Sequence, residues 1–175
     1  MANPLDPIWA WYQLTLDCMR VTQRAARDPT LSTAFLSKHT NLFPLDPGAK
    51  LSAIDDAKET LDRLAVLDLA TVFERTLRTH LTSSLPVMIS DGPPFLHSLR
   101  DRVESRAERW TFDELVELYG SVGGGPRGLV KDIIKFRDWA AHGWHTTAKP
   151  APSNITPRDA YERLTDFLIA ARLAT

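Results

Sequence analysis

The sequence reads LDRLAVLDLATVFERTLRTHL from residue 61 to residue 81, and its apolar residues recur at roughly the spacing of a helix. These residues are Leu61, Leu64, Val66, Leu67, Leu69, Val72, Phe73, Leu77 and Leu81. Ser52 belongs to the residue types that cap helix N-termini, so we expect one long helix from about Ser52 to about Leu85. This helix is predicted to form the centre of the core.

Further helices are predicted on both sides of this stretch. They run from Pro7 to about Ala26, from Phe95 to about Trp110, from Thr111 to Tyr119, from Pro126 to about Ala141 and from Thr156 through Leu173. Proline and glycine interrupt the helical pattern at 28–50, 120–125 and 149–154, which predicts connections there. No stretch alternates long enough to indicate a sheet. We therefore expect an all-α, antiparallel bundle of about five to six helices, with residues 1–175 in a single domain.

Composition limits the possible functions. The formal net charge is -1 and the pI is about 6.5, so bulk electrostatics do not favour a protein that coats nucleic acid. Any contact with RNA must therefore be local. No basic leader or long apolar run is present, which indicates no membrane association and a cytoplasmic location.

Cysteine and histidine usage argues against a metal centre. Cys18 is the single cysteine, so an intramolecular disulfide and a multi-cysteine metal cage are both excluded. His39, His80 and His97 lack the spacing to partner ligands that zinc sites show. We expect no metal and no other cofactor.

The segment Arg137-Asp138-Trp139-Ala140-Ala141-His142 carries the residues best suited to chemistry. Metal-free RNA cleavage needs a group that moves protons and a cation that stabilises the charged transition state, and histidine and arginine supply these. On an ideal helix, five residues place Arg137 and His142 roughly 140° apart, so they cannot share one face. A helix that frays or turns near Gly143 would let His142 swing toward a groove that the arginine also reaches.

The residues from Lys135 to Gly143 resemble the signature of the HEPN superfamily, an arginine followed by four residues and a histidine. The resemblance implies a HEPN-like helical domain that forms a homodimer with its two motifs facing each other. It also implies a metal-independent endoribonuclease acting as a toxin or anti-phage effector, with a possible antitoxin or regulatory protein as partner. Some related toxins carry a modified tyrosine two residues after the histidine, where this chain has Trp144, so that mode of control is not indicated.

Each motif residue receives a predicted role. His142 is the general acid or base, Arg137 positions and stabilises the scissile phosphate, and Asp138 orients one of them. Lys135 and His145 are predicted to contact the RNA substrate.

Accessory roles are open for neighbouring residues. Lys131 could guide phosphate toward Arg137, although lysines on a helix usually face solvent. Trp139 and Trp144 could stack on unpaired bases or pack in the core or a dimer. Glu74 and Arg75 could buttress Arg137 across the bundle, but nothing in the sequence places them there.

Two other readings of the motif stay open. In the first, the chain is a non-catalytic HEPN-like module that binds RNA, a nucleotide or a protein through the same groove. In the second, it is a structural or oligomerisation domain, where Arg137 and Asp138 form an ion pair at a helix end and His142 interacts with the helix dipole.

Overall fold

The computed structural model describes residues 2–28, 38–42, 44–89, 101, 109–143 and 154–175. Within these ranges the chain contains five α-helices and no β-strand, which confirms the predicted all-α bundle. The α-helices are α1 (Asp6–Arg27), α3 (Pro47–Ile89), α5 (Phe112–Leu118), α6 (Gly124–Asp138) and α7 (Pro157–Ala170), accompanied by the 3₁₀ turn η1 (Gly120–Val122) and the π-helical turn η2 (Trp139–Gly143). The helix predicted from Phe95 to Trp110 falls almost entirely outside the described residues.

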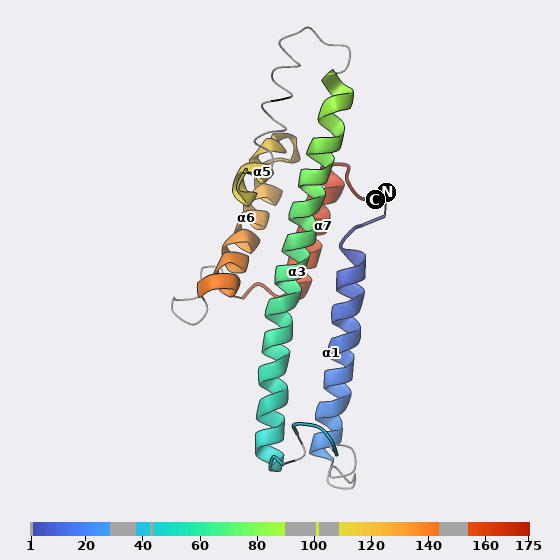
Figure 1. Cartoon of the computed structure of the whole chain (residues 1–175), viewed down its shortest axis with the longest axis vertical. Helices are drawn as coiled ribbons and strands as arrows, with labels where there is room; N and C mark the ends of the chain where they lie inside the picture. The colour runs from blue at the N-terminus through green and yellow to red at the C-terminus, as the bar shows by residue number, and fades with distance from the viewer. Residues whose placement is uncertain (1, 29–37, 43, 90–100, 102–108, 144–153) are drawn as a thin grey trace.

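The long helix α3 is the axis of the molecule (Figure 1). Its 43 residues span about 64 Å at 1.5 Å per residue. Helices α1 and α6 run antiparallel to α3 and α7, with α1 along the N-terminal half of α3 and α6 and α7 beside its C-terminal half (Figure 1). None of the helices in the described ranges is long and apolar enough to cross a membrane.

Proline and aspartate determine where the first two helices begin. Pro7 lies in the first turn of α1, as predicted, because its missing N–H is not needed there. Helix α3 begins at Pro47, so the predicted start at Ser52 is wrong. The side chain of Asp46 accepts a hydrogen bond from the backbone N–H of Ala49 at 2.9 Å and caps the helix six residues before Ser52. The connection predicted through Lys50 is correspondingly shorter.

Aromatic rings form the centre of the main core. Phe73 of α3 is fully buried and contacts Phe167 of α7 edge-on, with ring centroids 5.2 Å apart. Phe112 of α5 lies 5.8 Å from Phe73, and Tyr119 lies 6.0 Å from Phe167. Such rings bury large apolar areas, so this cluster joins three helices into one core.

A second, smaller cluster joins α1 to the N-terminal half of α3. It consists of Tyr12, Leu61 and Ala65. The hydroxyl of Tyr12 donates a hydrogen bond to Asp62 at 2.8 Å. Two effects raise the pKa of Tyr12 well above its ordinary value: burial is the larger, and this hydrogen bond is the second. The phenol therefore stays protonated at neutral pH and fixes α1 on α3.

Among the described helices, α5 and α7 each begin with a capping box. At α5, the side chain of Thr111 accepts from the backbone N–H of Glu114, whose carboxylate accepts from the backbone N–H of Thr111 at 2.7 Å. Thr156 and Asp159 make the same reciprocal pair at α7. The starts predicted at Thr111 and Thr156 are therefore confirmed.

Thr111→Ala is expected to lower the free energy of unfolding by about 1 kcal/mol, because it leaves helix N–H groups of α5 without their acceptor. Urea unfolding followed by circular dichroism measures this change. Thr71→Ala is the matched control, since Thr71 is exposed in the middle of α3 and its hydroxyl donates only to the Leu67 carbonyl of the same helix. Equal stability of the two variants would contradict the capping role.

Candidate functional site

Helix α6 carries the motif and is anchored by a buried apolar side. Gly123 precedes the helix with a φ of 88°, a backbone conformation that glycine adopts without strain. The helix starts at Gly124, so the break predicted through Gly125 is two residues shorter. Val130, Ile133 and Ile134 then pack into the main core. This packing fixes the direction of α6 against α3 and α7.

The motif does not lie on a regular helix. Helix α6 ends at Asp138, and the five residues of η2, Trp139–Gly143, form a π-helical turn. The expected departure from α-helical geometry near Gly143 is therefore present and begins four residues earlier. A π turn bonds residues five apart and is wider than an α turn, so the 140° separation of an ideal α-helix does not apply to Arg137 and His142. Such turns are often found at functional sites.

Arg137 is half-buried and held by two carboxylates. Its Nη1 donates to Asp138 at 2.9 Å, and its Nη2 donates to Glu74 of α3 at 3.5 Å. Glu74 also accepts from Arg78 at 2.7 Å, and Arg78 donates to the Trp110 carbonyl at 2.6 Å. The guanidinium therefore belongs to a network that links α6, α3 and the start of α5.

Asp138 and Glu74 share the role that the sequence predicted for Asp138 alone. Asp138 is exposed, and its carboxylate accepts a hydrogen bond from Arg137. Glu74 is the contributor that the sequence could not place, because it lies 63 residues before Arg137. The only sign of the contact between Glu74 and Arg137 in the sequence is that Glu74 is a polar residue of α3.

His142 stands apart from this network. It is exposed in η2, and within the described part of the chain no hydrogen bond to its ring is found. An exposed imidazole keeps both ring nitrogens accessible to a substrate. The site therefore combines an oriented cation with a titratable group that a ligand can reach.

The accessory residues divide into three groups. Lys135 is exposed, 3.9 Å from Asp132, and is available to an anionic ligand. Lys131 instead forms ion pairs with Glu117 and Asp113, and these raise its pKa. Because the ammonium group is engaged by these carboxylates, the structure does not favour the predicted role of Lys131 in guiding phosphate. His145 lies outside the described residues, as does Trp144.

The aromatic residues of the motif pack inward. Phe136 is only 3% exposed and belongs to the main core, so it is not available to a dimer interface. Trp139 is half-buried, 5.5 Å from Phe136, and lines a hollow of about 240 Å³ with Arg63 of α3 and Thr156 before α7. Trp139 therefore resembles a core residue more than an exposed ring on which RNA bases could stack.

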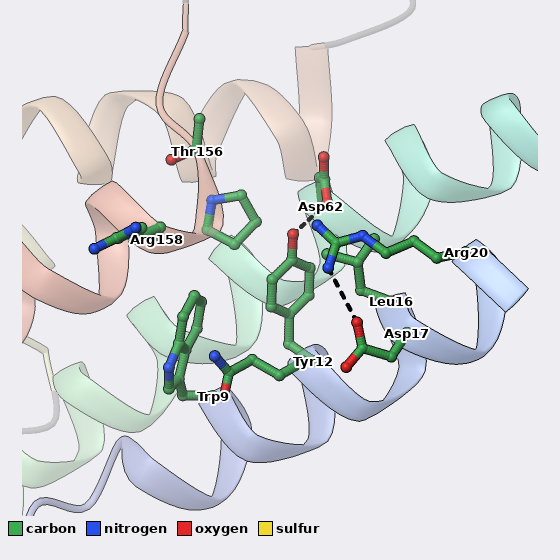
Figure 2. A pocket seen from close by; sticks show the side chains of 10 residues that line it. Trp9, Tyr12, Leu16, Asp17, Arg20, Asp62, Thr156 and Arg158 are labelled. Atoms are coloured by element: carbon green, nitrogen blue, oxygen red, sulfur yellow. Dashed lines mark hydrogen bonds and ion pairs between the residues drawn. The ribbon is translucent and has the colours of Figure 1, made fainter.

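A larger hollow of about 510 Å³ adjoins this one and shares Asp62, Thr156 and Pro157 with it. Figure 2 shows the Tyr12 hydroxyl pointing at Asp62, with Arg20 beside them. Arg20 is already paired with Asp17 at 3.0 Å. This hollow could not be predicted from the sequence, because its walls come from α1, α3 and the start of α7.

The described residues contain no group of three or more histidine, cysteine, aspartate or glutamate side chains that could hold a metal ion. Comparison of the chain with known protein families, with curated proteins and with solved structures finds no match. The assignment of the site therefore depends on the chemistry of Arg137 and His142 and on their surroundings.

Proposed function

We propose that this chain is a HEPN-like, metal-independent endoribonuclease whose active site contains Arg137 and His142. The observation that carries the proposal is the contrast between the two side chains. Arg137 is oriented by Glu74 and Asp138, whereas His142 is exposed in a π turn at the end of the same helix. Oriented cations stabilise developing phosphate charge well, because they need not reorganise during the reaction.

The two residues divide the chemistry of transesterification. The 2′-oxygen attacks phosphorus while its proton is removed, and the bond from phosphorus to the 5′-oxygen breaks as that oxygen gains a proton. His142 transfers one of these protons. Arg137 uses two of its five N–H donors on Asp138 and Glu74, so the others can bind the phosphate oxygens. The products are a 2′,3′-cyclic phosphate and a 5′-hydroxyl.

Two proton transfers, with one His142 in each chain, favour a site shared by two copies. We propose a two-fold homodimer in which a second Arg137 and a second His142 face the first pair across one groove. The exposed side of α6 near the motif is polar, with Lys135, Asp138 and His142 exposed. RNA bound between the copies would therefore meet cationic and hydrogen-bonding groups. Lys135 is the nearest further phosphate contact, and His145 stays a predicted one.

The biological role that fits such a nuclease is that of a toxin or anti-phage effector. Cleavage of cellular RNA slows growth, so an antitoxin or regulatory protein would be needed to hold it inactive. Expression of the wild-type chain in bacteria should slow growth, and His142→Ala should relieve the effect. Equal growth of both strains would argue against a toxin.

Incubation of the purified protein with mixed RNA in a chelator tests the activity itself. We expect fragments ending in 2′,3′-cyclic phosphate from the wild type and none from His142→Ala. His39→Asn is the matched control, because His39 is exposed and its φ of 65° suits asparagine. Retained cleavage by His142→Ala would refute the assignment. RNA binding without cleavage by the wild type would instead favour a non-catalytic HEPN-like binding module.

A further inference from the structure

We propose that the outer face of α1 pairs with the α1 helix of a second copy of this chain, in antiparallel orientation. This face, here called the outer seam, consists of Trp11, Leu14, Cys18 and Val21. All four residues are exposed, and the exposed fractions of Trp11, Leu14 and Val21 are 44%, 68% and 63%.

The outer seam lies on the side of α1 that its own core does not use. Tyr12, Leu16 and Met19 point to the other side and form the cluster with α3. A surface helix normally turns polar residues outward, because exposed apolar area is unfavourable in water. A contiguous apolar stripe on the outer side of such a helix indicates an interaction surface.

The spacing of the outer seam indicates that its partner is a helix. Its residues are three, four and three positions apart, and Ala25 continues the series after four more. This alternation is that of the a and d positions of a coiled coil, which keep one seam facing a partner helix. From Trp11 to Ala25 it covers two heptads, about 21 Å of helix.

The charges beside the outer seam indicate that the partner is a second copy running in the opposite direction. Asp17 and Arg24 are both exposed and lie one heptad apart on the same edge of the seam. In an antiparallel pair this edge faces the same edge of the partner helix, so Asp17 lies opposite the partner's Arg24. Because the pair is two-fold symmetric, this contact occurs twice. In a parallel pair the edge would instead face Thr15 and Thr22, which carry no charge.

Two features of the structure allow this pairing. The ion pair between Asp17 and Arg20 is exposed and therefore weak, so Asp17 can exchange partners. Helices α1 and α6 lie on opposite sides of α3 (Figure 1), so the seam leaves Arg137 and His142 uncovered. The inference is independent of the proposed nuclease and of the dimer proposed at α6.

Sedimentation of the full chain over a range of concentrations tests the contact. Leu14→Glu should raise the dissociation constant at least about a hundredfold, because two-fold symmetry removes the leucine from the interface twice. Ile169→Glu is the control, since Ile169 is 46% exposed on α7 and lies outside the seam. Circular dichroism should show both variants folded. A wild type that is monomeric at the highest soluble concentration, or association that Leu14→Glu leaves unchanged, would overturn the proposal.

Cysteine cross-linking tests the orientation. The charge pairing places Cys18 opposite the partner's Val21, so wild type mixed with the Cys18→Ser/Val21→Cys variant should form disulfide-linked dimers under mild oxidation. Each protein alone should not. Links in the wild type alone would indicate a parallel pair and overturn the antiparallel one, and the absence of links in the mixture would also overturn it.

Charge reversal tests the partner edge in the same assay. Asp17→Arg and Arg24→Asp should each weaken association, and the double variant should restore it, because the two contacts are then reversed together. Failure of the double variant to recover would show that Asp17 and Arg24 do not meet.

Discussion

Arg137→Ala is expected to lower the single-turnover rate of RNA cleavage by about a hundredfold to a thousandfold. Removing one preorganised donor to a developing oxyanion has an effect of this size, and the Arg137 guanidinium is already held by Glu74 and Asp138. Arg137→Lys should recover only part of the rate, since lysine keeps the charge but lacks the planar fork of donors.

Arg127→Ala separates this effect from the loss of any arginine on α6. Arg127 is at the other end of the helix, pairs with Glu117 at 2.7 Å, and has a side-chain exposure of 25%, against 29% for Arg137. Its cleavage rate should equal that of the wild type, and both variants should melt cooperatively. If Arg127→Ala and Arg137→Ala lost activity to the same degree, the special role of Arg137 would be disproved.

Phe73→Ala should lower the free energy of unfolding by about 3 to 5 kcal/mol. The ring is fully buried between Phe112 and Phe167, so its removal leaves a cavity that three helices cannot easily close. Urea unfolding monitored by tryptophan fluorescence and by circular dichroism measures the loss. Leu64→Ala is the control, because Leu64 is half exposed on the same helix and should cost far less. A loss below about 1.5 kcal/mol for Phe73→Ala would mean that the core repacks freely.

Local signals in the sequence predicted most of the helices. The capping pairs that begin at Thr111 and Thr156 gave the starts of α5 and α7 because hydrogen bonding there involves residues only three apart. The cap of α3 was placed six residues too late because Asp46 and Ser52 are both good caps, and local pattern alone does not choose between them. The proline at position 47 favours the earlier start.

The candidate site was predicted only in part. The motif placed Arg137, Asp138 and His142 on one helix end, but the contact of Arg137 with Glu74 depends on how α6 crosses α3. Such crossings follow from side-chain packing over the whole bundle. The sequence predicted a departure from the α-helix near Gly143, but not a π turn that begins at Trp139, since Trp139 to His142 include no proline or glycine to mark it.

The unequal size of the two apolar clusters has a consequence for motion. The free end of the α1–α3 pair, residues 16–27 and 47–60, extends beyond α6 and α7 (Figure 1) and is joined to the main core through the small cluster around Tyr12. Among the described residues this end contains few buried side chains, so it can open locally at a lower free energy than the whole molecule. The aromatic core around Phe73 and the network around Arg137 would stay intact during such openings. A second copy paired along α1 would suppress them, so association at one side would stiffen the end of the molecule farthest from the motif.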